Sequence, residues 1–270
     1  MALLPPKNLI QDAIESIDII NDKPRSYLGY SGMAHKCLRV HKYNLHWCYT
    51  SSHPARVDRL FRRGDYEETV VAKDLERIGV QFFDDQAEVS GGFGYAKGHI
   101  DGKVTNVPGY EDELMLLEIK TMNDKKFKEY FKKGLKEFNP IYYGQIMSYM
   151  GKLELSKCLY IATNKNDESR VYTIMDFDYE EYKRLERVAE SVPLMDRLPD
   201  KIGGKTWIDC KYCNAKKICH YNGAVNKTCR SCENVTLEGD GVWSCGSSDS
   251  LDYDAQLSAC DRYILSSLFE

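Results

Sequence analysis

Alternating apolar and polar residues predict two neighbouring strands in the middle of the chain. Residues 114–121 are mostly apolar, and side chains on a strand alternate between two faces, so Glu118 and Lys120 share one face. Residues 98–104 have the pattern of a second short strand, and the stretch between them has a loop composition with a Pro-Gly pair. If the two strands pair as a hairpin, Asp101 comes within reach of Glu118.

Earlier in the chain, residues 65–78 have the periodicity of a helix, and Gly79 is expected to end it. Its expected buried stripe is formed by Val71, Leu75 and Ile78. Glu68 flanks this stripe, whereas Glu67 falls further toward the edge. A carboxylate that faces inward needs a partner, because burying a bare charge is costly. That partner is either a metal ion or a buried Arg or Lys.

The remaining elements complete an α/β pattern. Helices are expected at 7–20, 142–150 and 179–195, and strands at 157–163 and 170–176. Residues 124–138 carry six lysines among apolar residues, directly after Lys120. Lys125 and Lys126 are candidates for phosphate contacts, and a solvated amphipathic helix is the alternative.

The predicted hairpin has the chemistry of a hard-metal site. Carboxylates of Glu68, Asp101 and Glu118, helped by the Ile119 carbonyl, suit Mg²⁺ or Mn²⁺. Such an ion polarises a phosphodiester and lowers the pKa of a water molecule, while Lys120 orients that water or stabilises negative charge. The alternative is a solvated hairpin in which these charges occur by chance.

The composition predicts one main domain with an appendage. The chain has 270 residues, 43% hydrophobic, and a net charge of only −4, so nothing marks it globally as a nucleic-acid binder. Its N-terminus has neither a signal peptide nor a membrane span, which favours the cytoplasm. Seven of the ten cysteines lie in the last 61 residues, and in a reducing compartment this favours metal binding over disulfides.

Cysteine spacing alone leaves the metal site open. Cys210, Cys213, Cys229 and Cys232 fit a Cys-x₂-Cys-x₁₅-Cys-x₂-Cys zinc site. Thiolates suit zinc and iron–sulfur clusters alike, and reduced structural cysteines are the remaining alternative.

In chain order, Glu68, Gly98-His-Ile-Asp101, Glu118-Ile-Lys120 and Gln145-x-x-x-Tyr149 resemble the RecB-type branch of the PD-(D/E)xK nucleases. The similarity is to phage exonuclease-like members related to the CRISPR-associated RecB-like exonucleases, and it extends over residues 28–260. It implies a restriction-endonuclease-like core, with a central mixed sheet flanked by helices, and divalent-metal cleavage of DNA. It also implies that Gln145 and Tyr149 position the DNA strand. The chain lacks the Pro that often precedes the Asp101 position.

The resemblance also implies a different division of the cysteines. A 4Fe-4S cluster would be held by Cys37, Cys210, Cys213 and Cys219, and the remaining Cys229, Cys232, Cys245 and Cys260 would form a zinc module. The expected domains are an N-terminal extension (1–27), the nuclease core (28–200) and a Cys-rich segment (201–270).

The expected function is that of a DNA exonuclease in phage-type recombination, repair or processing, with DNA and phage recombination or replication proteins as partners. A structure-specific endonuclease and a catalytically inactive, zinc-bearing DNA-binding protein are the alternatives.

Overall fold

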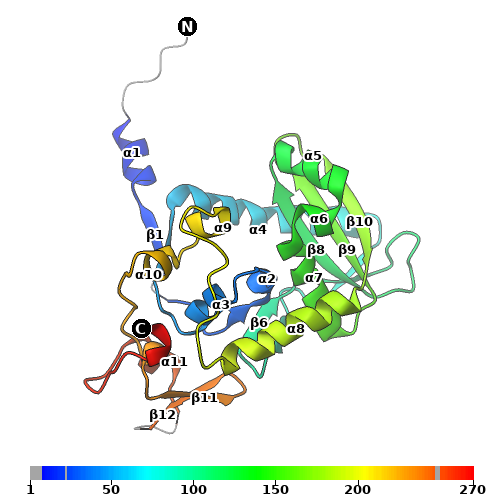
Figure 1. Ribbon diagram of the computed structural model, residues 1–270. Coiled ribbons are helices and arrows are strands. Elements are labelled where there is room, and N and C mark those ends of the chain that lie inside the picture. Colours follow the sequence, from blue (N-terminus) through cyan, green and yellow to red (C-terminus); the bar gives the residue numbers. More distant parts are fainter. Residues whose placement is uncertain (1–7, 22, 247–249) are drawn as a thin grey trace.

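The computed structural model describes residues 8–21, 23–246 and 250–270 and contains a five-stranded mixed sheet, which lies on the right-hand side of Figure 1. Its strand order is β10 (Arg170–Asp176), β9 (Lys157–Asn164), β8 (Met115–Met122), β7 (Gly102–Thr105) and β4 (Gln81–Phe83). β8 and β9 are parallel, and the other neighbours are antiparallel. The predicted α/β class, a central mixed sheet flanked by helices, is confirmed.

Helices cover both faces of this sheet. They are α4 (Ala55–Glu76) on one face and α5 (Asp124–Lys133) and α7 (Pro140–Leu153) on the other, with α6 (Leu135–Phe138) between α5 and α7, while α8 (Tyr179–Leu194) packs against α7. The alternation along β8 explains the two layers, because Leu117 and Ile119 cluster with Val71 of α4. Leu116 points the other way and clusters with Ile146 of α7.

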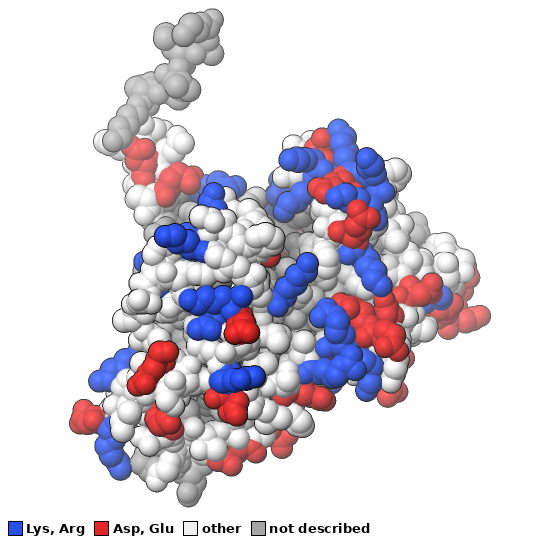
Figure 2. All heavy atoms as spheres, in the orientation of Figure 1, with Lys and Arg blue, Asp and Glu red and all other residues white. Residues whose placement is uncertain are grey.

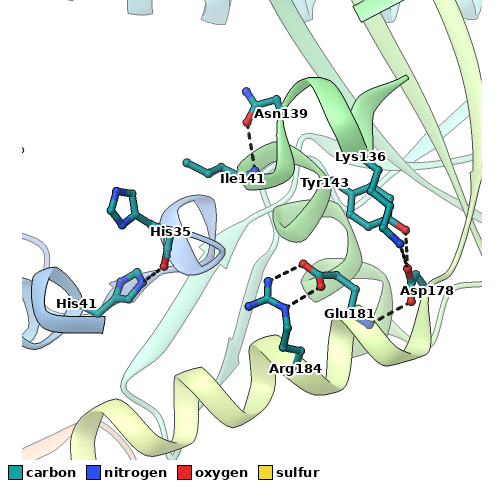
Figure 3. Close-up of polar contacts among 9 residues, drawn as sticks. All are labelled: His35, His41, Lys136, Asn139, Ile141, Tyr143, Asp178, Glu181 and Arg184. Carbon is teal, nitrogen blue, oxygen red and sulfur yellow. Dashed lines mark hydrogen bonds and ion pairs between the residues drawn. The ribbon is translucent and has the colours of Figure 1, made fainter. Parts of the chain in front are cut away.

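Side-chain caps fix where the helices of the second layer begin. Asn139 accepts a hydrogen bond from Ile141 N at 3.2 Å and caps α7 (Figure 3). Asp178 caps α8 and also accepts from Lys136 Nζ and Tyr143 Oη, both at 2.8 Å. These donors, with the Lys136 ammonium the strongest, lower the pKa of Asp178 to about 2. The single carboxylate therefore ties α6, α7 and α8 together.

Smaller sheets and short helices surround the core. The sheets pair β2 (Leu28–Gly29), β6 (Ala96–His99) and β5 (Glu88–Gly91); β1 (Asp18–Asn21) and β3 (Ser51–Pro54); and β11 (Val235–Gly239) and β12 (Val242–Cys245). The other helices are α1 (Leu9–Glu15), α2 (Tyr30–Met33), α3 (Leu38–Leu45), α9 (Ile208–Lys211), α10 (Lys216–His220), α11 (Tyr253–Leu257), and the 3₁₀ turns Cys229–Ser231 and Ser267–Phe269.

Arg230 joins the tail, residues 201–270, to the N-terminal part of the chain. Its guanidinium is buried between the rings of Trp47 and Trp243, 3.8 and 4.4 Å from their centroids. It donates to the carbonyls of Ser26 and Leu45 at 2.9 and 3.0 Å. Burial lowers the pKa of Arg230 to about 9, and Trp243 itself belongs to the main core cluster.

Three helices differ in the structure from the bounds or burial that the sequence predicted. The expected leading helix ends at Glu15, and β1 follows it, paired with β3; residue 7 lies outside the described residues. Ile78, expected in the buried stripe, is 60% exposed because α4 ends at Glu76. The helix expected over 124–138 breaks at Gly134, where φ is +72°.

Candidate active site

Asp101 lies where the chain passes from one sheet to another. The strand expected over 98–104 is in fact two, β6 and β7, which belong to different sheets. Gly102 follows with φ +154° and pairs with Leu117 of β8. The backbone N–H of Ile119 donates to Asp101 Oδ2 at 2.7 Å. The predicted hairpin thus forms, and its register places the Asp101 carboxylate against the middle of β8.

Glu118 and Lys120 form an ion pair on the α7 side of β8. Glu118 is fully buried, and its Oε1 contacts the ammonium of Lys120. Lys120 Nζ also lies 3.9 Å from Asp101 Oδ2 and donates to the Ile119 carbonyl at 3.2 Å. Within the described part of the chain, Glu118 Oε2 is buried without a hydrogen-bond partner. This buried oxygen has unused capacity to coordinate a cation.

Glu68 reaches the same place from α4. It is half-buried and lines a groove of about 590 Å³ together with Asp101, Gln86 and Ile119. Gln86 Nε2 donates to its Oε2 at 3.4 Å.

Glu67 is the more deeply buried of the two neighbouring acids, so its expected place near the edge of the helix was wrong. It faces the sheet and pairs with Arg170 of β10 at 3.0 Å. The partly buried Arg170 thus neutralises Glu67, whereas Glu68 faces the groove.

Burial and the proximity of other charged groups shift the pKa values of this site. Burial, and next the Asp101 carboxylate, raise the pKa of Glu68 to about 7. The same two causes raise the pKa of Glu118, against the opposing effect of Lys120. Burial acts to lower the pKa of Lys120, but Glu118 and Asp101 outweigh it and raise that pKa. Lys120 therefore remains an ammonium at neutral pH.

This arrangement gathers three acids and one ammonium from three elements. Carboxylate oxygens are the donors that Mg²⁺ and Mn²⁺ prefer, and the unpartnered Glu118 Oε2 fits such an ion. As it stands, no group of three or more His, Cys, Asp or Glu in residues 8–21, 23–246 and 250–270 is arranged to hold a metal. The Lys120 ammonium, in contact with Glu118 and near Asp101, provides the positive charge instead.

Gln145 and Tyr149 lie behind this site and are 7% and 2% exposed. Gln145 Nε2 donates to Tyr149 Oη at 3.3 Å. The ring of Tyr149 lies directly on Gly98 of β6, where an added Cβ would come within 2.5 Å of its hydroxyl. Tyr149 therefore packs against the strand that leads into Asp101.

Lys125 and Lys126 are exposed in the first turn of α5, the helix that directly follows β8. Figure 2 shows Lys and Arg side chains gathered over α5.

A buried ion pair that sequence reasoning missed supports Tyr149 from behind. Glu186 of α8 pairs with Lys152 and accepts from Tyr30 Oη at 3.1 Å. The ring of Tyr30 packs edge-on against Tyr149, with centroids 6.1 Å apart. Tyr30 lies 156 positions from Glu186, so no local pattern could indicate this contact.

Cys37 and the seven cysteines of the tail gather in two separate places. Cys37, Cys210, Cys213 and Cys219 line one cavity, with His35 and His220 beside them. Cys229, Cys232, Cys245 and Cys260 line another. Burial raises the thiol pKa of Cys210 and of Cys229, and neighbouring cysteines of the same set add to each shift.

The set suggested by spacing alone is divided between the two cavities. Cys210 and Cys213 lie in one, and Cys229 and Cys232 in the other. Cys48 and Cys158 are fully buried.

Comparisons with known proteins give only distant similarities. No protein family matches the chain, and a search of curated proteins finds no match. Among solved structures, SSO0001 is 16% identical with a TM-score of 0.43, covering 78% of this chain and 91% of its own. The alkaline exonuclease LHK-Exo from Laribacter hongkongensis is 17% identical with a TM-score of 0.46, covering 63% and 87%. LHK-Exo in complex with dAMP gives 16%, 0.43, 63% and 88%.

Identities and TM-scores this low do not indicate a function. The functional proposal therefore rests on the side chains of the site. Of the helices in the described part of the chain, none combines the length and apolar character needed to cross a bilayer.

Proposed function

We propose that this protein is a divalent-metal-dependent deoxyribonuclease, and specifically an exonuclease that hydrolyses DNA from its ends. The observation that supports this most is the convergence of Glu68, Asp101 and Glu118 beside one ammonium, with Glu118 Oε2 unpartnered in the described structure. Exonucleolytic action in phage-type recombination or processing, with phage recombination or replication proteins as partners, is the role that the RecB-type motif order favours.

In this proposal Glu68, Asp101 and Glu118, with the Ile119 carbonyl, hold Mg²⁺ or Mn²⁺. When bound, such an ion supplies positive charge beside the scissile phosphate and makes an attacking water easier to deprotonate. Asp101 is already oriented, because Ile119 N–H donates to its Oδ2.

Lys120 serves as a fixed cation in the proposed reaction. Its pKa is raised by Glu118 and Asp101 against the effect of burial, so it donates hydrogen bonds and does not remove a proton. It is suited to stabilise the negative charge that grows on the phosphate as water attacks. The face of the Tyr142 ring, 5.8 Å from Nζ, limits where the ammonium can move.

Cleavage of linear and circular DNA with Mn²⁺ tests the proposal. Wild type should degrade labelled linear DNA and leave circles intact. Asp101→Asn should cut at least about hundredfold more slowly, because even residues that only support a metal ligand cost 10- to 100-fold. Asp112→Asn, in the exposed loop after β7, is the matched control and should cleave normally.

Each alternative outcome has a meaning. Cutting of circles identifies an endonuclease instead. DNA binding by wild type without cleavage in either Mg²⁺ or Mn²⁺ refutes the nuclease.

We also propose that the two cysteine sets bind different metals, with a 4Fe-4S cluster at Cys37, Cys210, Cys213 and Cys219. Zinc is assigned to Cys229, Cys232, Cys245 and Cys260. Support comes from the separation of the two cavities and from the four cysteines that line each of them, since cysteine ligands suit both kinds of centre.

Metal analysis of anaerobically purified protein separates the two assignments. Cys37→Ala should lose iron and its visible absorbance but keep zinc, and Cys229→Ala should do the reverse. Cys158→Ala changes a buried thiol of the core and should keep both metals. Full iron content in Cys37→Ala contradicts the cluster, and zinc in place of iron in wild type supports two zinc sites.

A further inference from the structure

Residues 201–221 are basic in a chain that is acidic overall. This segment, which contains α9 and α10, has five lysines and a single acidic residue, while the whole chain has a net charge of −4. The lysines are Lys201, Lys205, Lys211, Lys216 and Lys217, and all but the half-buried Lys216 are exposed. In Figure 2, Lys and Arg side chains are visible over the α9–α10 part of the surface as well as over α5. A local positive surface of this kind attracts a polyanion.

Three aromatic rings of the same segment are exposed to solvent. Trp207, Tyr212 and Tyr221 are 54%, 72% and 54% exposed. Lysines accompany two of them: Lys211 Nζ lies 5.3 Å from the Tyr212 ring, and Lys205 Nζ lies 5.9 Å from the Tyr221 ring. Exposed rings interleaved with cations match what single-stranded nucleic acids need, because bases stack on the rings and phosphates bind the lysines.

The backbone holds Trp207 in a defined position although its ring is half exposed. The indole lies against Gly203, where an added Cβ would come within 2.7 Å of its Cγ. Trp207 N–H donates to Gly204 O at 2.9 Å, and Trp207 O accepts from Lys211 N at 2.7 Å. A ring fixed in this way loses little conformational freedom when a base stacks on it.

Tyr212 also lines a groove together with residues of α2. This groove, of about 710 Å³, is lined by Ile208 and Tyr212 and also by Arg25 and Ser31. Ser31 belongs to α2, whose Tyr30 packs on Tyr149 behind the acidic site. The groove therefore borders the short helix that, through Tyr30, also supports Tyr149.

We propose that residues 201–221 form a binding surface for single-stranded DNA. Bases stack on Trp207, Tyr212 and Tyr221, and the surrounding lysines contact phosphates. The choice of DNA among polyanions rests on the proposed nuclease function, whereas the stacking surface itself does not.

Binding of a fluorescent dT20 oligonucleotide, followed by anisotropy, tests this surface without cleavage. All proteins carry Asp101→Asn, and no divalent ion is added. The variant Trp207→Ala/Tyr212→Ala should bind dT20 at least fivefold more weakly, since each stacked base contributes about 1–3 kcal/mol. Lys211→Gln should weaken binding and reduce the salt dependence by about 0.7 in the slope of log K against log salt.

Tyr179→Ala is the matched control. Tyr179 lies on α8, is 56% exposed, and has Lys183 Nζ 5.7 Å from its ring, so it repeats the Tyr212–Lys211 chemistry elsewhere. This control should bind dT20 as the parent does. Iron and zinc contents and thermal unfolding of every variant establish that the Cys210 and Cys213 neighbourhood stays intact.

The outcomes separate this inference from the nuclease proposal. Equal binding by the Trp207→Ala/Tyr212→Ala variant and the Tyr179→Ala control overturns the surface, even if wild type cleaves DNA. Absence of dT20 binding by the parent overturns it too. Selective loss in the double variant supports the surface, even if wild type shows no cleavage with Mn²⁺.

Discussion

Replacing Lys120 with methionine tests the electrostatic account of the acidic site. Methionine fills a similar volume and removes the ammonium that contacts Glu118 and approaches Asp101. At 3.9 Å and an effective dielectric constant of 20, the interaction with Asp101 alone is about 4 kcal/mol before desolvation. Breaking a buried pair on one side costs about 3–5 kcal/mol, because it leaves an uncompensated charge. We therefore expect metal-free Lys120→Met to lose about that much unfolding free energy at pH 8.

The expected loss depends on pH in a defined direction. A carboxylate whose pKa is raised on folding favours the folded state below its unfolded pKa, and that contribution is lost as pH rises through the folded pKa. For Glu68 this window runs from about 4.5 to about 7, and Glu118 is raised as well. At pH 6 both acids are largely protonated, so the substitution should destabilise the protein less than at pH 8.

Urea unfolding at the two pH values, with and without Mn²⁺, measures these effects. Mn²⁺ should stabilise Lys120→Met more than wild type, because the ion replaces the missing ammonium. Lys128→Met removes an exposed ammonium 2.8 Å from Asp124 and should change stability little. The electrostatic account of the acidic site is refuted if Lys120→Met has the same unfolding free energy as wild type at pH 8 and gains no extra stability from Mn²⁺.

Three further predictions concern single positions. Mn²⁺ affinity measured by calorimetry should rise between pH 6 and pH 8, because Glu68 must lose the proton that its pKa of about 7 retains; in Glu68→Gln this rise should shrink. Gly98→Ala places a methyl group 2.5 Å from the Tyr149 hydroxyl and should cost about 1–3 kcal/mol in urea unfolding, whereas Gly32→Ala, with open space around it, should not. Arg230→Met removes the donor to the carbonyls of Ser26 and of the buried Leu45, so limited proteolysis should release the tail, and an unchanged cleavage pattern would contradict this role.

Local sequence patterns were sufficient for the hairpin but not for the orientation of α4. The two-residue period of β8 fixes the faces of Glu118 and Lys120, and both share the α7 side in the structure. Whether Glu67 or Glu68 faces the sheet depends on a rotation of α4 by one residue, about 100°. Arg170, which lies 103 positions away, decides it by pairing with Glu67. A pattern read along one helix has no access to such a partner.

The break between β6 and β7 shows why the same limit applies to Asp101. Residues 98–104 have one continuous strand pattern, yet the chain changes sheets after His99, and β7 then pairs with β8. The change of sheet exposes the Asp101 side chain to Ile119 N–H and to the groove at once. In a continuous strand, the Asp101 side chain would instead point to one face of the sheet. Tyr149, by packing on Gly98 just before the break, holds the first strand where Asp101 can meet Glu118. In the proposed nuclease, the buried Gln145–Tyr149 pair would therefore act through the position of Asp101, and direct contact with DNA is not required for that role.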